Sequence, residues 1–373
     1  MNYGISSFAK TSTMKKYTDL FVFLILMISP LILFSSCKEK KDDPEPVPEK
    51  FIFKAADLSF LPMIENDGVT FYNREGQAED MLTTLKNAGM NTVRIRIWHS
   101  PANGISGFQE VKAFSQRVKA RGLKVWLTVH YSDTWADPGN QQPPLAWQNL
   151  TINVLKDSVY AYTSKIMTDI SPDFIQIGNE INGGMIWPLG RSANMDNLKG
   201  LLESGVKAVR DNSTSCKIMM HYAGTNGAEQ LLANLQSIDY DIIGISYYPK
   251  WHGKDLAQLE ADLKWLSNRF FKPVMIAETS YPFTFEWNDW TNNIIGGDNQ
   301  IITGIPASEA GQLSFMKEIK RISTSSSQLI GFAYWGGEWV AYKGPQATNG
   351  SSWENQAFYD FDFKALPVIE AFE

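Results

Sequence analysis

The sequence has little of what metal, nucleotide or polyanion chemistry requires. It contains four His in 373 residues, and none of them stands in an HxH or HExxH spacing, so no catalytic metal is predicted. No glycine-rich phosphate loop follows the first apolar run, which argues against a nucleotide-binding sheet. Lys and Arg number 34 against 40 Asp and Glu, a net charge of -6, so nucleic acid is not an expected partner. An uncharged ligand fits this composition best.

Cysteine is nearly absent, and the two that occur have separate meanings. Cys37 closes an apolar run, Leu20–Phe34, that two lysines precede, which is the layout of a signal peptide. The run is too short to span a membrane, and its ending, LFSSC, resembles a bacterial lipobox. We therefore expect Cys37 to carry a lipid, in preference to a cleaved soluble signal. Cys216 is then alone in the mature protein, which leaves no intrachain disulfide.

The chain divides into three parts by composition. Residues 1–37 are predicted to be the lipoprotein signal peptide. Met14 is an alternative start, because Met14 and the two lysines after it form the usual positively charged N-terminal region of a signal peptide. Residues 38–50, KEKKDDPEPVPEK, are charged and proline-rich, which indicates an extended tether. A charged stretch after the cysteine resembles the surface-export signal of Bacteroides-type lipoproteins. We expect a monomer held in the envelope of a Gram-negative bacterium by its lipid alone, at the outer membrane and exposed at the surface.

Residues 51–373 alternate short apolar runs with longer amphipathic stretches. Helical spacing joins Ala78, Met81, Leu82 and Leu85, and likewise Leu256, Leu259, Leu263 and Leu266. The eight apolar runs are Phe51–Phe60, Asn91–Trp98, Leu123–Tyr131, Phe174–Ile181, Cys216–Ala223, Asp241–Pro249, Pro273–Pro282 and Leu329–Gly337. Eight βα units in this length predict an α/β fold, a single (β/α)8 TIM barrel with elongated βα loops.

Each apolar run ends in groups that bind or react. They are Asp57 and Ser59, Arg96 and Trp98, His130 and Tyr131, Asn179 and Glu180, His221, Tyr247 and Tyr248, Glu278, and Trp335. Buried parallel strands have no packing reason to finish in acids and imidazoles. In a TIM barrel the carboxyl ends of all strands meet at one face, so this bias predicts an active site there.

Two of these strand-end residues form a carboxylate pair. Glu180 ends the fourth run and Glu278 ends the seventh, and these two strands nearly face each other across a closed barrel. Glycosidic bonds are cleaved by two carboxyl groups, one protonating the leaving oxygen while the other attacks carbon or activates water. A single Glu would more simply pair with a nearby cation such as Arg96. Two Glu residues at facing strand ends favour the catalytic interpretation.

The two glutamates follow the fourth and seventh predicted strands, and Asn179 directly precedes Glu180. This arrangement resembles glycoside hydrolase clan A, whose members retain anomeric configuration. Longer strings resemble family 53, the arabinogalactan endo-β-1,4-galactanases, in order over nearly all of residues 56–340. They are Ala56–Ser59 (ADLS), Val93–Trp98 (VRIRIW), His130–Pro138 (HYSDTWADP), Gly178–Ile181 (GNEI), Trp187–Gly190 (WPLG), Ile245–Pro249 (ISYYP) and Glu278–Pro282 (ETSYP). The resemblance implies endo-hydrolysis of β-1,4-galactan in type I arabinogalactan, an activity that belongs to pectin degradation.

By that resemblance Glu180 is the acid/base and Glu278 the nucleophile, and Asn179 donates to the sugar 2-hydroxyl. The acid must keep its proton, so we expect a raised pKa at Glu180, whereas the nucleophile must stay ionised. Arg96 is the expected cation that lowers the pKa of Glu278, although Arg94 shares its side of the strand. Tyr247 or Tyr248 is the expected hydrogen-bond donor to Glu278.

Twelve Trp and fourteen Tyr offer flat amphipathic rings that suit sugar faces. The candidate platforms are Trp98, Trp135, Trp187, Trp335 and Trp339, and the candidate polar contacts are Asp57, His99, His130, Asp133 and Asn182. His221 and His252 are expected to have structural roles. We predict no cofactor. Some bacterial members of the family look able to bind a structural calcium ion in the loop after the nucleophile. We do not expect that site here, because Glu286–Trp290, in the loop after Glu278, offers few oxygen ligands. A different calcium site, including Asp298, stays open.

Three alternatives remain at this point. A clan A relative that cuts β-mannan, xylan or β-glucan differs only in hydroxyl contacts, which a residue list does not reveal. A non-catalytic glycan-binding lipoprotein is disfavoured because both Glu180 and Glu278 are present. A surface scaffold without glycan affinity is the third.

Overall fold

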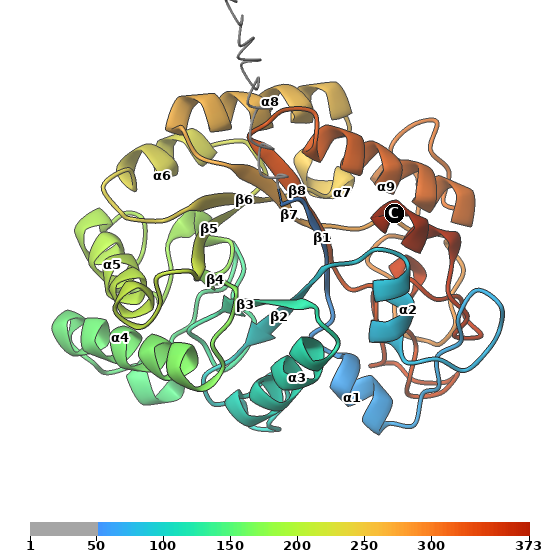
Figure 1. Ribbon diagram of the computed structural model, residues 1–373, viewed down its shortest axis with the longest axis horizontal. Helices are drawn as coiled ribbons and strands as arrows, with labels where there is room; N and C mark the ends of the chain where they lie inside the picture. The colour runs from blue at the N-terminus through green and yellow to red at the C-terminus, as the bar shows by residue number, and fades with distance from the viewer. Residues whose placement is uncertain (1–50) are drawn as a thin grey trace, which may run out of the picture. The chain divides into compact units, whose positions relative to one another are not determined.

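The computed structural model describes residues 51–373, so the predictions for the signal peptide, Cys37 and the tether lie outside the described residues. Eight parallel strands, paired in chain order, close into a barrel in which β1 hydrogen-bonds to β8 (Figure 1). The strands are β1 (Phe53–Asp57), β2 (Thr92–Ile97), β3 (Lys124–Val129), β4 (Phe174–Ile177), β5 (Lys217–Ala223), β6 (Ile242–Ser246), β7 (Val274–Thr279) and β8 (Leu329–Tyr334). Each predicted apolar run contains one strand, and the predicted TIM barrel is confirmed.

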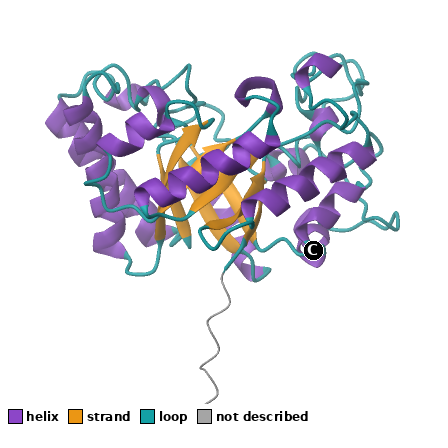
Figure 2. Ribbon diagram, turned by 90° about the horizontal axis from the view of Figure 1, so that it is seen from above, coloured by secondary structure: helices purple, strands orange, loops and turns teal. Residues whose placement is uncertain are grey.

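Helices surround the strands, and Figure 2 shows the orange strands between purple helices. They are α1 (Leu61–Asn66), α2 (Met81–Asn87), α3 (Phe108–Ala120), α4 (Ile152–Asp169), α5 (Met195–Asn212), α6 (Ala228–Asn234), α7 (Pro249–His252), α8 (Leu256–Phe270) and α9 (Glu309–Ser323). The predicted apolar faces of α2 and α8 are buried, although Ala78 lies before α2 in a bridge with Tyr72. Short 3-10 turns are η1 (Leu145–Trp147), η2 (Ile181–Gly183), η3 (Asp298–Gln300), η4 (Glu354–Gln356) and η5 (Pro367–Phe372).

The barrel has two apolar cores because strand side chains alternate between its inside and its outside. A large cluster packs the helices against the outer face of the strands. A smaller one fills the lower barrel, and its members are Phe53, Ala55, Trp126, Phe174, Met219, Ile242, Met275, Ala277 and Ala333. Further along the same strands, the inward positions change to polar residues such as Arg94, Gln176 and His221, all buried. The apolar plug therefore forms the floor of a polar chamber.

An irregularity in β7 sets the direction of Glu278. Met275 and Ala277 belong to the inner cluster, so strict alternation would turn residue 278 outward. The pairing of β6 with β7 shifts between Ile245 and Ser246, where Ile245 faces Ile276 but Ser246 faces Glu278. A β-bulge of this kind adds one residue and re-aims the next side chain. Glu278 consequently points into the chamber.

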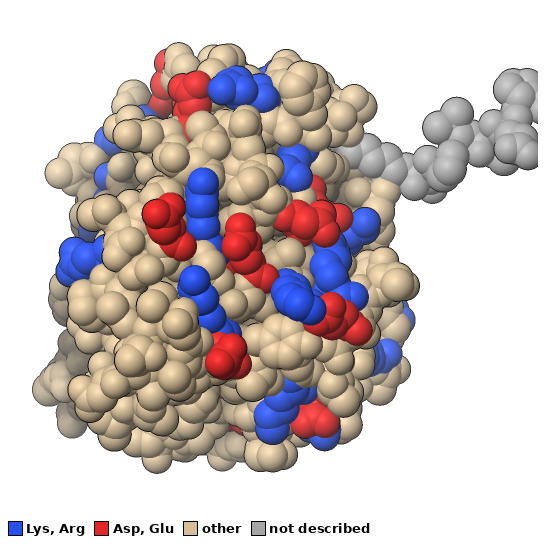
Figure 3. Space-filling view, turned by 90° about the vertical axis from the view of Figure 1, so that its left-hand side faces the viewer, with Lys and Arg blue, Asp and Glu red and all other residues tan. Residues whose placement is uncertain are grey.

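The loops after β7 and β8 are long and hydrogen-bonded to each other. Trp290 N donates to Ala347 O at 2.9 Å, and Ile294 N donates to Ser352 O at 3.0 Å. These bonds make the two loops one wall beside the carboxyl ends of the strands. On the face that carries α4 and α5, basic and acidic side chains are interspersed (Figure 3). No helix among residues 51–373 is both long and apolar enough to cross a membrane.

Candidate active site

A cavity of about 620 Å³ opens at the carboxyl ends of the strands. Its walls carry both predicted glutamates together with Asp57, Arg94 and Asn179. Tryptophans line much of the rest, namely Trp135, Trp251, Trp335, Trp339 and Trp353. Carboxyl groups at the base with aromatic rings around them suit a ligand that has apolar faces and polar rims, as sugars do.

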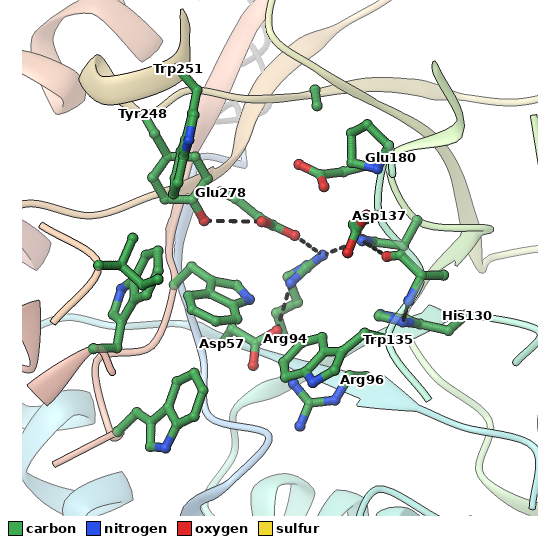
Figure 4. Close-up of a pocket in the computed structure, with 18 of the residues that line it drawn as sticks. Asp57, Arg94, Arg96, His130, Trp135, Asp137, Glu180, Tyr248, Trp251 and Glu278 are labelled. Atoms are coloured by element: carbon green, nitrogen blue, oxygen red, sulfur yellow. Dashed lines mark hydrogen bonds and ion pairs between the residues drawn. The ribbon is translucent and has the colours of Figure 1, made fainter. Parts of the chain in front are cut away.

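Glu180 and Glu278 face each other across this cavity (Figure 4). One carboxylate oxygen of Glu180 lies within 4.8 Å of one of Glu278. Glycosidases that retain configuration place their two carboxyl groups about 5–5.5 Å apart, whereas inverting enzymes leave about 6.5–9.5 Å for a water. The pair therefore has the spacing of a double-displacement site.

Arg94 and Tyr248 hold Glu278 from two sides. Arg94 Nη2 donates to Glu278 Oε1 at 2.6 Å, and the Tyr248 hydroxyl donates to Oε2 at 3.0 Å. Arg94 also pairs with Asp57 at 2.6 Å and donates to Asn179 Oδ1 at 2.9 Å. Both oxygens of Glu278 thus accept hydrogen bonds, one of them from a cation, which stabilises the ionised form.

Glu180 stands in a strained backbone turn directly after β4. Its φ is +45°, in the left-handed region that non-glycine residues rarely occupy, and Gly178 before it has a φ of +80°. Ser246 Oγ donates to Glu180 Oε1 at 2.6 Å, and His221 Nε2 lies 2.9 Å from the same Ser246 oxygen. His221 is fully buried and supports this hydroxyl, in keeping with its predicted structural role.

The two carboxyl groups differ in what opposes the effect of burial. Burial and the charge of Glu278 raise the pKa of Glu180 to about 8, although the Ser246 hydrogen bond and the charge of Arg94 oppose this rise. Burial also raises the pKa of Glu278, but the charge of Arg94 and the Tyr248 hydrogen bond oppose that rise. The proton of the pair accordingly resides on Glu180. An arginine lowers the pKa of Glu278 as predicted, but desolvation outweighs the cation, so the pKa remains above its usual value.

The predicted partner of Glu278 also needs correction, since Arg94 and not Arg96 makes the ion pair. Arg94 lies in register with Asp57, level with the carboxylates. Arg96 comes two residues later, about 6.6 Å further along the strand at about 3.3 Å per residue. There its guanidinium stacks against the rings of Phe60 and Trp135 and bonds Ser106 Oγ. Arg96 still lines the cavity.

The structure brings eight of the predicted contact residues to the cavity wall. They are Asp57, Arg96, His130, Trp135, Asn179, Tyr248, Trp335 and Trp339. His130 is buried, and its Nδ1 accepts from Ala136 N at 3.0 Å. Asn179 donates to Ala136 O at 2.8 Å and keeps a second amide hydrogen for a ligand.

Six predicted contact residues lie outside the lining of this cavity, namely Trp98, His99, Asp133, Asn182, Trp187 and Tyr247. Their polar atoms bind protein groups. Asp133 accepts from Ser100 N and Leu145 N, and His99 packs on Trp147 and Tyr162. Asn182 bonds the backbone of Ala223, and Trp187 donates to Gly183 O. The Tyr247 hydroxyl donates to Gly253 O, and Trp98 is buried with its indole nitrogen 3.4 Å from His130.

Sequence reasoning missed several residues of the cavity. Arg94 was an alternative only, and Ser246 stood inside a quoted motif without a role. Asp137, Trp251 and Trp353 line the cavity but were not selected. Asp137 is the second-last residue of the HYSDTWADP string and Trp251 comes two residues after the ISYYP string, so these motifs were the available signal. Trp353 lies in the long loop after β8, where no motif marks it.

Glu180, His221 and Glu278 also form the one group of three potential metal ligands found among the described residues. Their surroundings favour a proton-transfer site. Both His221 nitrogens have partners, Nδ1 with Gln176 at 2.8 Å and Nε2 with Ser246, while Arg94 already neutralises Glu278. Asp289 in the loop after β7 and Glu354 in the loop after β8 each keep one buried oxygen without a hydrogen-bond partner.

The barrel and the carboxylate pair at the ends of β4 and β7 define the chain as a glycoside hydrolase. The model of glycosyl hydrolase family 53 matches residues 53–372, and the chain belongs to this family. An endo-β-1,4-galactanase of Bacillus subtilis is 32% identical, covering 87% of this chain and 86% of its own. An arabinogalactan endo-β-1,4-galactanase A of Aspergillus niger is also 32% identical, covering 86% and 94%. Among solved structures, the family 53 catalytic domain of Ignisphaera aggregans has a TM-score of 0.81 at 33% identity, covering 88% and 97%.

Proposed function

We propose that this enzyme is an endo-β-1,4-galactanase that hydrolyses galactan and type I arabinogalactan with retention of configuration. Glu180 is the acid/base and Glu278 the nucleophile. The observation that carries the proposal is the separation of the two carboxylates, within 4.8 Å, combined with their unequal surroundings. Membership of family 53 and the galactanase relatives support the choice of substrate.

The reaction proceeds in two displacements. First, a Glu278 oxygen attacks the anomeric carbon while Glu180 gives its proton to the glycosidic oxygen, and the leaving sugar departs. This forms a covalent ester between Glu278 and the remaining sugar. Glu180, now ionised, then removes a proton from water, the water oxygen attacks the same carbon, and Glu278 is released. The second inversion restores the β configuration.

The remaining residues of the chamber hold this geometry. Arg94 and Tyr248 fix both oxygens of Glu278 before substrate arrives, so little reorganisation is needed in the reaction. Asn179 keeps one amide hydrogen free toward the cavity, where a hydroxyl of the reacting sugar can accept it. Such a contact lowers the barrier when it strengthens as charge develops on the sugar.

The substrate is tested by following products from linear β-1,4-galactan over time, with β-mannan, xylan and β-glucan in parallel. We expect rapid release of mixed oligosaccharides from galactan, as random internal cutting produces, and much slower release from the other three polymers. If mannan, xylan or glucan were cleaved as fast as galactan or faster, that polymer and not galactan would be assigned as the substrate.

The same assay separates an enzyme from a glycan-binding protein. Glu180→Gln should lower turnover of galactan by about 10²–10⁴-fold, the usual contribution of a general acid and base, while galactan still binds. Wild-type protein that binds galactan but releases no sugar would favour the binding protein. Wild-type protein without affinity for any of these glycans would favour a scaffold.

We further propose that the enzyme is a monomer anchored in the outer membrane through a lipid on Cys37, exposed at the cell surface. Its support is the lipobox-like LFSSC string and the charged tether that follows it. Cys37→Ser should move the protein from the membrane fraction to the soluble fraction and leave its specific activity on galactan unchanged. A wild-type protein already found soluble would contradict the anchor.

A further inference from the structure

We infer that His252, with Trp251 beside it, binds the sugar that leaves with the glycosidic oxygen. The inference rests on the proposed function and gives His252 a direct contact with the ligand, whereas the sequence predicted only a structural role for it. Both residues lie in α7, directly after Tyr248, and both line the active-site cavity.

Hydrogen bonding fixes the orientation and the tautomer of His252. Its Nδ1 accepts the backbone N–H of Tyr248 at 3.0 Å, and burial lowers the pKa of the ring to about 4. A neutral imidazole whose Nδ1 is an acceptor carries its proton on Nε2. No group within residues 51–373 forms a hydrogen bond with Nε2. Nε2 is also not one of the fully buried polar atoms that lack a partner, so it is open to the cavity. His252 therefore presents an N–H donor at the cavity wall.

Gly224 makes room for this ring. Its φ is +74°, and a Cβ placed there would lie 2.9 Å from His252 Cδ2. A side chain at position 224 would thus push the imidazole away from its place. The backbone after β5 is shaped around the His252 ring.

The position of His252 points to the leaving group. Ser246 Oγ bonds Glu180, and Ser246 O accepts from Gly224 N at 2.9 Å, so the ring of His252 lies on the flank of Glu180. Arg94 and Asp57 occupy the opposite flank, behind Glu278. Because the general acid protonates the leaving oxygen, the sugar attached to that oxygen meets the groups on its flank.

Trp251 supplies the apolar surface that a sugar face requires. It is 50% exposed, and its ring stacks on Trp353 with centroids 6.3 Å apart and planes 20° apart. Figure 4 shows Trp251 above Tyr248 at the edge of the cavity. An indole face next to an N–H donor is a suitable site for one uncharged hexose.

The test compares two substrates that differ only in the leaving group. A β-1,4-galactotetraose loses a sugar, whereas 4-nitrophenyl β-1,4-galactobioside loses a phenol that has no sugar hydroxyl. His252→Asn retains an acceptor for Tyr248 N but has no donor at the position of Nε2. We expect kcat/KM for the tetraose to fall about 5- to 10-fold, the worth of one neutral hydrogen bond, with the aryl substrate within about twofold.

Two results would overturn the inference. An equal loss on both substrates would mean that His252 only positions Tyr248, and no loss on either would mean that Nε2 binds no sugar. Failure of the proposed function is seen separately, because wild-type protein would then cleave neither substrate.

A second pair of variants covers the case in which His252→Asn does not fold. Trp251→Ala should also slow cleavage of the tetraose by about 5-fold or more while sparing the aryl substrate. Trp265→Ala removes a comparably exposed indole from α8, outside the cavity, and should change neither rate. Equal behaviour of the two tryptophan variants would overturn the inference.

Discussion

Arg94 determines the charge balance of the chamber, because one cation serves two buried acids. Its side chain pairs with Asp57 and with Glu278, each at 2.6 Å, and stands over the ring of Trp126 at 5.3 Å. All three charged groups are nearly inaccessible to water. Removal of the cation would leave two carboxylates buried without compensation, which costs far more than an exposed pair.

We predict that Arg94→Met lowers the free energy of unfolding by about 3–5 kcal/mol, as when one partner of a buried pair is removed. It should also raise the pKa of Glu278 further, because the charge that opposes the effect of burial is lost. The rate needs Glu278 ionised, so the acidic limb of the kcat/KM profile moves to higher pH. Arg74→Met, which breaks an exposed pair with Glu370, should cost about 1 kcal/mol at most. Equal effects of the two variants would contradict this role.

The alkaline limb belongs to Glu180. Catalysis needs this carboxyl protonated, so activity falls as the pH rises through its raised pKa. Ser246 donates to the ionised form and lowers that pKa, and Ser246→Ala should therefore move the alkaline limb to higher pH. A pH–rate profile on galactan checks the shift. A limb that stays in place, or moves to lower pH, would show that another group controls it.

Among single residues, the sequence predicted the two acids and, as one of two candidates, the tyrosine that bonds Glu278, but it chose the wrong arginine as its ion-pair partner. Glu180 and Glu278 end apolar runs, and a strand-end carboxylate in a barrel has few structural explanations. Arg94 and Arg96 share one side of β2, so alternation alone could not choose between them. Arg94 pairs with Glu278 because it lies level with the carboxylates, whereas Arg96 lies further along the strand and stacks against Phe60 and Trp135.

At the scale of elements, two departures from regular strand geometry aim the acids. The bulge in β7 turns Glu278 inward, and the turn after β4 places Glu180 with positive φ. Gly178 begins that turn at φ +80°, and a Cβ there would lie 2.7 Å from Ile181 Cγ2. The position of Glu180 therefore depends on a residue without a side chain.

Gly178→Ala should both destabilise the protein and lower its activity. Left-handed backbone costs a non-glycine residue about 1–2 kcal/mol, and the contact with Ile181 adds to this by shifting the turn. Gly76→Ala is the matched control, since Gly76 has a φ of +78° but open space around it. Thermal melts should show a loss for both variants, whereas kcat on galactan should fall only for Gly178→Ala. Full activity of Gly178→Ala would contradict the proposed role of the turn.

The sequence predicted the elements well and their irregularities poorly. All eight strands lie inside predicted apolar runs, because periodicity reports which faces are buried. A bulge changes the register by one residue without changing composition, so Val274–Thr279 gave no sign of it. Among the six displaced contact residues, Asp133, Trp187 and Tyr247 have polar side-chain atoms bound to backbone groups in the connections between strands. Those loop conformations follow from tertiary contacts that a single sequence does not display.

For the molecule as a whole, the apolar plug in the lower barrel supports the polar chamber. Trp126 is fully buried in that plug, beneath Arg94. Its truncation would open a cavity under the ion pairs that fix Glu278. The stability of the fold and the geometry of the site are thus coupled through one layer of side chains.

Trp126→Ala should lower the free energy of unfolding by about 3–5 kcal/mol, the range for large-to-small changes in a core. Trp265→Ala, on the exposed side of α8, should change it by about 0.5 kcal/mol at most. Urea denaturation of both variants against wild type measures the difference. A cost below about 1 kcal/mol for Trp126→Ala would contradict the supporting role of the plug.

The most direct test of the account is to trap the covalent intermediate. A 2-deoxy-2-fluoro β-galactobioside with a good leaving group should react once and remain attached, because the fluorine slows the release step. Mass spectrometry of peptides from the inactivated protein should find the sugar on Glu278, and Glu278→Gln should take up no label. A label on Glu180, or hydrolysis that yields the inverted α-sugar with no trapped enzyme, would contradict the assignment of the pair.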